Sequence, residues 1–239
     1  VLATNVKHNE VLEAQGLNEA GSDSEVFHNL TIDAINSTVL DPKGRIKILS
    51  KKLTEELNGG ALGGNTILVY GRPEIGKSAL VISIARTLAL QGLEGIFFEN
   101  EDPIKSTIER VQACMTGMDS LQRLKNPEEA QKLLDSNGYG NIRFVNIAPG
   151  SVHEIDSFCE EYSPKWVIVN QLRNLRTRAE NRTNQLENIA TDLRAVAKRR
   201  NVLLIGVTQA GDSASEKLVL DIGDVDSSNT GMPAQQDVM

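Results

Sequence analysis

The sequence has only two cysteines, only three histidines and no long apolar run. Cys114 and Cys159 lie far apart without the spacing of a metal site, so we expect both to be buried apolar residues in a reducing compartment. The histidines are isolated, and their spacing matches neither a catalytic nor a metal site. No apolar run approaches the roughly 20 residues that span a bilayer, and the first residues do not form a signal peptide. These absences predict a soluble intracellular protein with no membrane partner.

Excess positive charge is also missing, since 25 Lys and Arg face 32 Asp and Glu, a net charge of −7. This balance excludes a protein covered in basic charge for non-specific nucleic-acid binding. The charge is unevenly distributed, however: residues 172–200 contain eight Lys or Arg against three acids, within an otherwise acidic chain. A local basic channel is therefore compatible with the sequence. The hydrophobic fraction of 40% is enough for a folded core.

Apolar runs alternate with amphipathic stretches from residue 45 onward, which predicts an α/β fold with a mainly parallel sheet and helices on both faces. We expect strands at 66–70, 95–98, 141–147, 166–169 and 202–208, and helices at 77–91, 104–115, 152–161 and 184–200. Ligands of such sheets bind beyond the carboxyl ends of the strands. Before this pattern, 25–39 predicts a short amphipathic helix, which packs either on its own domain or on a neighbouring subunit.

The segment Gly71–Ser78 matches the Walker A pattern, a glycine and four residues followed by Gly-Lys-Ser. It lies between a predicted strand and a predicted helix, as this phosphate-binding loop requires. Its backbone N–H groups and the helix N-terminus would surround phosphate oxygens, with Lys77 on the β- and γ-phosphates and the Ser78 hydroxyl on Mg²⁺. The predicted nucleotide-binding residues are Gly71, Arg72, Pro73, Glu74, Ile75, Gly76, Lys77, Ser78 and Ala79.

Acidic residues follow the second predicted strand, at the same edge of the sheet as the phosphate loop. Hydrolysis of a nucleoside triphosphate needs a group that orients the attacking water. Glu99 and Glu101 are both candidates for this role, and the alternative is a solvated acidic loop. From the residues alone, the choice between the two glutamates stays open.

The run Val167–Asn170 has the form of a Walker B strand, in which an Asp normally ends the apolar run and helps to hold Mg²⁺. An Asn accepts through its amide oxygen but lacks the negative charge. Asn170 can be natural with a neighbouring acid compensating, can be an engineered substitution, or can mark a protein that binds nucleotide and barely hydrolyses it. If Asn170 is a defect, Asn170→Asp is expected to raise the hydrolysis rate.

Four arginines follow this strand in a stretch rich in Asn and Thr, namely Arg173, Arg176, Arg178 and Arg182. Guanidinium groups suit phosphate oxygens, so the cluster is a candidate for contact with a nucleic-acid backbone; the alternatives are a solvated loop or salt bridges between subunits. No aromatic residue is interleaved to stack on bases. At the end of the last predicted strand, Gln209 is a candidate sensor of the γ-phosphate, and its alternative role is that of an ordinary polar strand end.

From about residue 45 to 239 the chain resembles the RecA-type ATPase domain of hexameric replicative DNA helicases, in particular the DnaB-type and phage primase-helicase branch. A Walker A loop alone is common to many ATPases, whereas the ordered set of segments is more specific. The segments are Leu57–Gly60, Gly71–Ser78, Phe98 with Glu101, Val167–Leu172, Leu193–Ala197 before Asn201-Val202, Val207–Gln209, Asp224–Gly231 and Gln236–Met239.

The resemblance implies a RecA-like P-loop fold that uses ATP or another nucleoside triphosphate with Mg²⁺. It implies catalytic roles for Lys77, Glu101 and Gln209, with the spacing to Arg110 favouring Glu101 over Glu99, and a metal role for Ser78 and position 170. The loops after Asn170 and Gln209 would face DNA. The family has Asp where this chain has Asn170, and the segment of its trans-acting arginine finger lies beyond residue 239.

The resemblance further implies a homo-oligomer, a hexameric ring around single-stranded DNA, in contact with the primase and polymerase of a replisome. Its setting would be the cytoplasm of a bacterial cell, with the gene bacterial or phage-encoded. We expect residues 1–44 to form an arm with the linker helix, and residues 45–239 to form a motor domain that is incomplete at its C-terminus.

The predicted function is that of a helicase motor, which couples hydrolysis at subunit interfaces to movement on single-stranded DNA and to duplex unwinding. One alternative is a recombinase-like or clock-type RecA-fold ATPase without unwinding. The other is a nucleotide-binding assembly module whose hydrolysis is negligible because of Asn170.

Overall fold

The computed structural model describes residues 44–177, 181–214, 217–225 and 231–239. The chain divides into two units, Val1–Gly44 and Arg45–Met239, and every element below belongs to the second. The amphipathic helix predicted for 25–39 lies outside the described residues.

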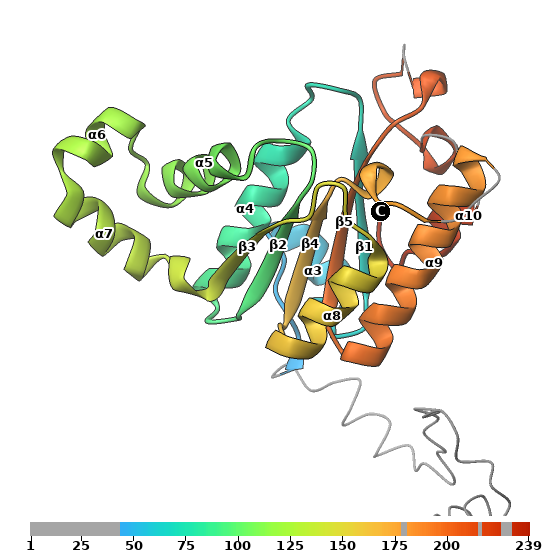
Figure 1. Cartoon of the computed structure of the whole chain (residues 1–239), viewed down its shortest axis with the longest axis horizontal. Coiled ribbons are helices and arrows are strands. Elements are labelled where there is room, and N and C mark those ends of the chain that lie inside the picture. The colour runs from blue at the N-terminus through green and yellow to red at the C-terminus, as the bar shows by residue number, and fades with distance from the viewer. Residues whose placement is uncertain (1–43, 178–180, 215–216, 226–230) are drawn as a thin grey trace, which may run out of the picture. The chain divides into compact units, whose positions relative to one another are not determined.

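A five-stranded parallel sheet forms the centre of the second unit, with the strand order β1-β5-β4-β2-β3 (Figure 1). The strands are β1 (Thr66–Gly71), β2 (Gly95–Glu99), β3 (Ile142–Asn146), β4 (Trp166–Asn170) and β5 (Leu203–Gln209). The predicted parallel sheet is therefore confirmed. Because the strands run in one direction, their carboxyl ends share one edge of the sheet, which we call the carboxyl edge.

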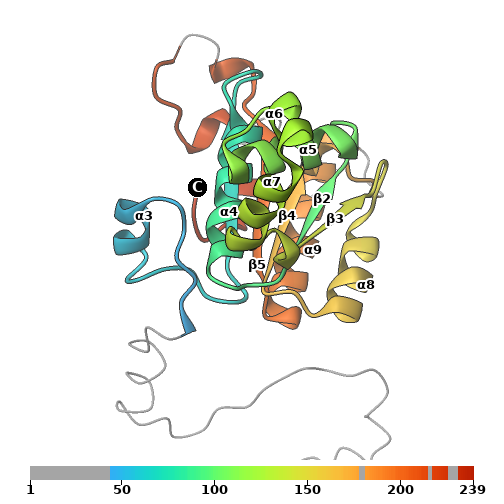
Figure 2. The same cartoon turned by 90° about the vertical axis from the view of Figure 1, so that its left-hand side faces the viewer.

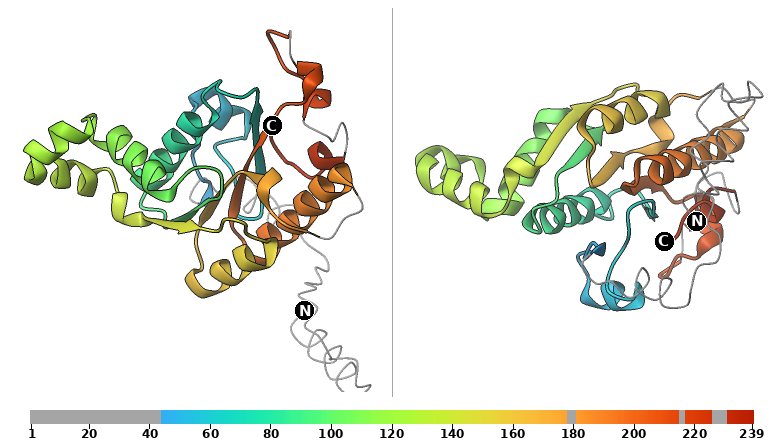
Figure 3. Two further views of the ribbon diagram at one scale, coloured as in Figure 1. Left: turned by 45° about the horizontal axis from the view of Figure 1, so that its top comes forward. Right: turned by 90° about the horizontal axis from the view of Figure 1, so that it is seen from below.

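Helices cover both faces of this sheet, with α4 and α5 on one face and α8 and α9 on the other (Figures 1 and 3). The longer helices are α4 (Lys77–Leu90), α5 (Ile104–Thr116), α7 (Pro127–Ser136), α8 (Val152–Tyr162) and α9 (Arg182–Arg200). The shorter ones are α3 (Lys51–Glu56), α6 (Ser120–Lys125), α10 (Gly231–Ala234) and the 3₁₀ turns at Tyr139–Asn141, Leu172–Asn174, Asp212–Ala214 and Ile222–Asp224. In the part of the chain that is described, no helix is long and apolar enough to cross a membrane.

Two hydrophobic clusters, one on each face, hold the layers together. Side chains alternate along a strand, so neighbouring strand residues enter different clusters. Phe97 packs with α4 and α5, whereas Phe98 packs with α8 and α9. Strands buried on both faces read as continuous apolar runs, which is why the sequence predicts their positions within two residues.

Four helices were not predicted: α3, α6, α7 and α10. Of these, α6 and α7 lie with α5 on the side of the sheet that faces the viewer in Figure 2. Two local signals mark their starts, since Asp119 caps α6 through a capping box with Gln122, and Pro127 occupies the first turn of α7. With six residues, α6 is too short for an apolar periodicity to be recognised, whereas α7 is amphipathic and buries Ala130 and Leu134.

At the opposite end of the strands from the carboxyl edge, Gly95 of β2 lies beside Trp166 of β4. A Cβ atom on Gly95 would lie 2.0 Å from the Trp166 ring, so only glycine fits there. The indole is fully buried, and its Nε1–H donates to the Leu93 carbonyl oxygen at 2.9 Å. This contact fixes the spacing of β2 and β4, the two strands that later present the acidic residues.

Candidate nucleotide-binding site

The phosphate loop leaves β1 at Gly71 and enters α4 at Lys77. Gly76 precedes the helix with φ +97°, a left-handed conformation that side chains with a Cβ rarely adopt. Its backbone turns the first N–H groups of α4 toward the space beyond the sheet. The N-terminus of a helix carries unpaired N–H groups and a positive partial charge, so this end of α4 can bind an anion.

Lys77 folds back over the loop, where its Nζ donates to the carbonyl oxygens of Gly71 at 3.0 Å and Arg72 at 2.8 Å. Burial lowers the pKa of Lys77 below its ordinary value, the Glu101 carboxylate opposes this shift, and the Arg173 guanidinium adds to it. The ammonium is therefore electrostatically connected to both the acidic loop after β2 and the basic stretch after β4.

A cavity of about 630 Å³ opens beside the loop at the carboxyl edge. Six of the nine predicted nucleotide-binding residues line it: Pro73, Glu74, Gly76, Lys77, Ser78 and Ala79. The other three do not: Gly71 is buried, Ile75 is 58% exposed, and the Arg72 guanidinium is turned toward the loop after β5. Cavities of this size hold small-molecule ligands such as a nucleotide.

The two candidate glutamates occupy different environments. Glu101 lines the cavity together with Asp102 and Arg110, and Arg110 Nη1 donates to Asp102 at 2.8 Å. Glu99 is 1% exposed and does not line the cavity. Of the two, only Glu101 can therefore reach a water molecule inside the cavity, and Glu99 can act only through its neighbours.

Asn170 is also 1% exposed and does not line the cavity. Its Nδ2 donates to both carboxylate oxygens of Glu99, at 3.1 Å each. Its Oδ1 is buried and has no hydrogen-bond partner among the described residues. The structure thus directs the donor of this amide toward Glu99 and leaves its acceptor unused.

The described residues contain no cluster of three or more His, Cys, Asp or Glu side chains that could hold a metal ion by themselves. Mg²⁺ commonly binds to one or two carboxylates together with nucleotide phosphates and water. Here residues Ser78, Glu101 and Asp102 line the cavity, and the Asn170 Oδ1, which has no partner among the described residues, is a further oxygen at the same edge of the sheet. This oxygen set fits Mg²⁺ bound together with a nucleotide.

Gln209 ends β5 and lines the cavity, and its Oε1 accepts a hydrogen bond from Nη1 of Arg173. Arg173 was predicted to contact DNA. The structure places its guanidinium against Gln209 and close enough to Lys77 to lower that residue's pKa, and its contact with DNA stays a prediction. The pairing joins the segments after β4 and β5, and the sequence contains no local signal for it.

The other predicted DNA-binding arginines are less fully described. Arg176 is exposed, and its backbone forms a parallel bridge with Ser151. Arg178 lies outside the described residues, as does the side chain of Arg182 at the start of α9. Their predicted contact with DNA stays a prediction.

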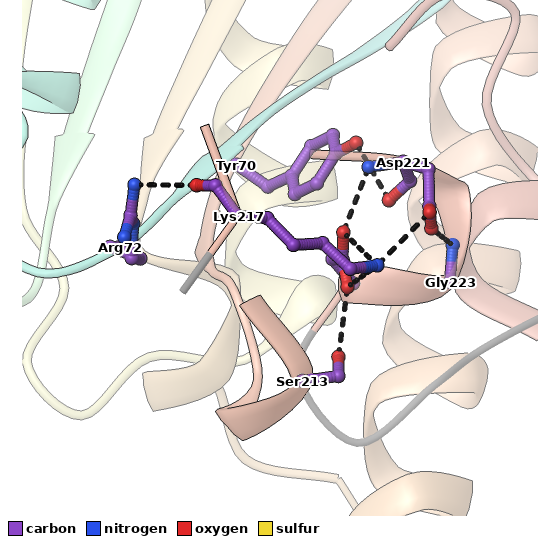
Figure 4. Close-up of polar contacts among 7 residues, drawn as sticks. Tyr70, Arg72, Ser213, Lys217, Asp221 and Gly223 are labelled. Carbon is purple, nitrogen blue, oxygen red and sulfur yellow. Dashed lines mark hydrogen bonds and ion pairs between the residues drawn. The ribbon is translucent and has the colours of Figure 1, made fainter. Parts of the chain in front are cut away.

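The loop after β5 is fastened to β1 and to the phosphate loop (Figure 4). Lys217 Nζ donates to both oxygens of the buried Asp224, at 2.8 and 3.0 Å, and to Asp221 at 3.0 Å. The Lys217 ammonium holds the pKa of Asp224 below its ordinary value. In addition, Arg72 donates to the Lys217 carbonyl oxygen at 2.9 Å, and the Tyr70 hydroxyl donates to the Asp221 carbonyl oxygen at 3.0 Å.

Residues 50–217, most of the described unit, match the family model of the DnaB-like helicase C terminal domain. The chain belongs to this family. Two solved structures illustrate that the fold is shared. One, an ATPase domain, superposes with a TM-score of 0.72 at 21% identity, covering 88% of this chain and 83% of that one. The other, a DnaB-like replicative helicase studied together with its interactions with primase, gives 0.72 at 20% identity, covering 95% and 59%.

Curated relatives of this DnaB-like domain carry two kinds of name. The DNA repair protein RadA of Bacillus subtilis is 22% identical over 192 residues, which are 77% of this chain. A probable plasmid replicative DNA helicase of Chlamydia trachomatis is 26% identical over 175 residues, or 64% of this chain. In both cases the match covers 37% of the relative, so the chain spans well under half of their length. The RecA-type recognition and the fold class are therefore confirmed, and the family description indicates a helicase-type domain.

Proposed function

We propose that the DnaB-like domain, residues 45–239, hydrolyses a nucleoside triphosphate with Mg²⁺ and uses the reaction to move along single-stranded DNA. The observation that carries the proposal is the cavity at the carboxyl edge, which brings together Lys77, Ser78, Glu101 and Gln209 from α4 and from the ends of β2 and β5. A plain strand-to-helix turn has no need of these four groups around one cavity.

In this mechanism each group acts on a defined part of the nucleotide. The loop N–H groups bind phosphate oxygens, and Lys77 exchanges its two carbonyl contacts for the β- and γ-phosphates. Ser78 would hold Mg²⁺ together with nucleotide oxygens, with the Asn170 amide oxygen as a further candidate ligand, and the bound ion would neutralise charge on the phosphates. Glu101 orients the attacking water and accepts its proton.

Coupling to DNA would begin at Gln209. A change at the γ-phosphate alters the Gln209 side chain, and its bond to Arg173 transmits this to the segment after β4. Arg72 transmits movement of the phosphate loop to the loop after β5 through the Lys217 carbonyl oxygen. Both segments would face single-stranded DNA, with Arg176, Arg178 and Arg182 on the phosphate backbone.

The proposal includes a homo-oligomeric, hexameric ring, with residues 1–44 as arm and linker and with primase and polymerase as partners. Family membership supports it, and one structural relative is a replicative helicase whose interactions with primase have been studied.

The test is nucleotide hydrolysis with and without single-stranded DNA, followed by unwinding of a forked duplex. We expect DNA to stimulate hydrolysis and the fork to be opened. Hydrolysis that DNA leaves unchanged would contradict the motor and favour an assembly module with little turnover, the alternative suggested by Asn170.

A second candidate is a RecA-fold ATPase that acts on DNA without unwinding it. The relatives named DNA repair protein RadA favour it, although the chain spans only 37% of their length. DNA-stimulated hydrolysis without unwinding of the fork would support this candidate over the helicase.

A further inference from the structure

The pair Glu99 and Asn170 lies at the carboxyl edge, where β2 and β4 are direct neighbours. The parallel register places the two residues opposite each other, and both are 1% exposed. One amide group contacts both oxygens of the carboxylate at 3.1 Å. A buried carboxylate needs donors around it, because burial removes the water that would otherwise solvate its charge.

Glu99 receives three further hydrogen bonds, and two of them come from the loop that carries the candidate catalytic residue. Its Oε1 accepts from the backbone N–H groups of Glu101 at 2.9 Å and Asp102 at 3.1 Å. Its Oε2 accepts from the Thr107 hydroxyl on α5 at 2.8 Å. The carboxylate therefore fixes the backbone of the two acidic residues that line the cavity.

The same loop is also attached to the end of β4. The Asn100 N–H donates to the Asn170 carbonyl oxygen at 2.8 Å, and the Gln171 N–H donates to Asn100 Oδ1 at 2.6 Å. The geometry of Glu101 relative to the phosphate loop thus depends on the contact between β2 and β4.

We propose that Glu99 is a positioning residue for Glu101, and that Asn170 is its matched amide partner rather than a defective metal ligand. The inference rests on the proposed function. The buried negative charge at this edge is carried by position 99. An Asp at position 170 would bring two carboxylates into contact in a site that is buried from solvent, and like charges repel strongly there. The substitution Asn170→Asp should therefore harm the protein, the opposite of what the sequence alone led us to expect.

The experiment compares four proteins: the unaltered protein, Asn170→Asp, Glu99→Gln and the double variant. We expect Asn170→Asp to lower the melting temperature by about 10 °C, because one buried carboxylate then faces another. In the double variant the introduced glutamine amide can donate to the introduced carboxylate, so most of this loss should be recovered. Losses that simply add in the double variant would overturn the pairing.

A control separates this contact from the chemical change itself. Asn146 ends β3 and is opposite Glu99 on the other side of β2, but it is exposed. Asn146→Asp is the same substitution beside the same glutamate, and water screens its charge. We expect its melting temperature and turnover to match those of the unaltered protein. A loss as large as that of Asn170→Asp would show that any added acid on this edge is harmful, which overturns the specific pairing.

The positioning role has a readout that a purely structural role would not move. Glu99→Ala removes the acceptor of the loop N–H groups. We therefore expect kcat to fall about 10- to 100-fold, the range typical of residues that hold a functional side chain in position through hydrogen bonds. Binding of a fluorescent nucleotide analogue should stay within about threefold, because the phosphate loop is intact. Glu99→Gln keeps an acceptor for the two N–H groups and should retain more turnover than Glu99→Ala. Equal turnover in both variants and the unaltered protein would overturn the role.

The failure of this inference can be told apart from the failure of the proposed function. If Asn170→Asp raises turnover without loss of melting temperature while Glu99 is present, Asn170 is a defective metal ligand and the inference is wrong. If none of the four proteins hydrolyses any nucleoside triphosphate, the proposed function fails and the positioning role fails with it. The melting temperatures of the four proteins still decide whether Glu99 and Asn170 are coupled.

Discussion

The two sides of the cavity are built in different ways. Beside β1, the site consists of backbone groups from one continuous loop. Beside β2 and β4, it depends on a buried side-chain contact between two strands. The phosphate loop needs a glycine at φ +97°, a helix N-terminus and one lysine, all within one short segment. The acidic loop needs Glu99 on β2 and Asn170 on β4, which are 71 residues apart. A site of the first kind can be read from a short pattern, but one of the second kind depends on which strands are neighbours.

This difference also predicts how the two sides respond to substitution. Changes in the phosphate loop should affect binding of the nucleotide itself. Changes on the other side should spare binding and affect turnover, since they alter the position of groups that act on the attacking water.

The largest effect is expected for Lys77→Ala. The ammonium is the only Lys side chain that lines the cavity among the described residues, so its loss should lower turnover by at least about 10²- to 10³-fold and also weaken nucleotide binding. Hydrolysis assays and binding of a fluorescent nucleotide would measure both, with Lys132→Ala on α7, away from the cavity, as the control. Full retention of binding and turnover would remove the central role of the phosphate loop.

Glu101→Gln should come next and should separate the two sides of the cavity. We expect kcat to fall by about 10²-fold or more, because the general base is lost, while nucleotide affinity stays close to that of the unaltered protein. The matched comparison is Glu99→Gln, which should cost less since Glu99 acts only through the loop. If Glu99→Gln costs more turnover than Glu101→Gln, the assignment of the base to Glu101 is wrong.

A smaller effect is expected for Arg176→Ala. This variant tests which arginines of the segment after β4 contact DNA and which act at the nucleotide site. If Arg176 contacts a phosphate of DNA, its loss should reduce the slope of log affinity against log salt concentration by about 1. Arg173→Ala should leave this slope unchanged and lower turnover, since its guanidinium bonds to Gln209. Equal changes of slope in both variants would place both arginines on DNA.

The smallest effect concerns an ion pair far from the cavity. Asp156 on α8 accepts from Arg199 and Arg200 on α9, at 2.8 Å each, and its hydrogen bond to Arg200 and then that to Arg199 hold its pKa below the ordinary value of 3.8 against the effect of burial. A depressed carboxyl pKa contributes stability that is present above the unfolded-state value of about 3.9 and is lost as pH falls through the folded value.

At neutral pH, Asp156→Asn should therefore lower the free energy of unfolding by about 1 kcal/mol or less, because solvent screens a partly exposed pair. The difference between the two proteins should shrink as the pH falls below about 3.9. Urea denaturation at both pH values would measure it. A difference that grows in acid would contradict the stated sign.

Much of the fold follows from the sequence, because buried parallel strands and amphipathic helices leave clear patterns. The phosphate loop, the carboxyl edge and the ends of the strands at Glu99, Asn170 and Gln209 could all be located in this way. The sequence could not reveal that β2 lies beside β4, since strand order depends on the packing of helices on both faces. For that reason the residues alone left open the choice between Glu99 and Glu101, and the contact between Glu99 and Asn170 was not predicted. The contact of Arg173 with Gln209 was not predicted for a similar reason, because it depends on β4 and β5 being neighbours.

The chain contains a single tryptophan, which is the first residue of β4 and lies buried against Gly95 of β2, at the end of the strands opposite the cavity. Its fluorescence therefore reports one place in the molecule. Emission should be at short wavelength while the indole is shielded from water, and should move to longer wavelength when these two central strands separate. Since the nucleotide would bind at the other end, the same signal should stay steady during turnover. The protein thus carries its own optical probe for unfolding that is independent of its chemistry.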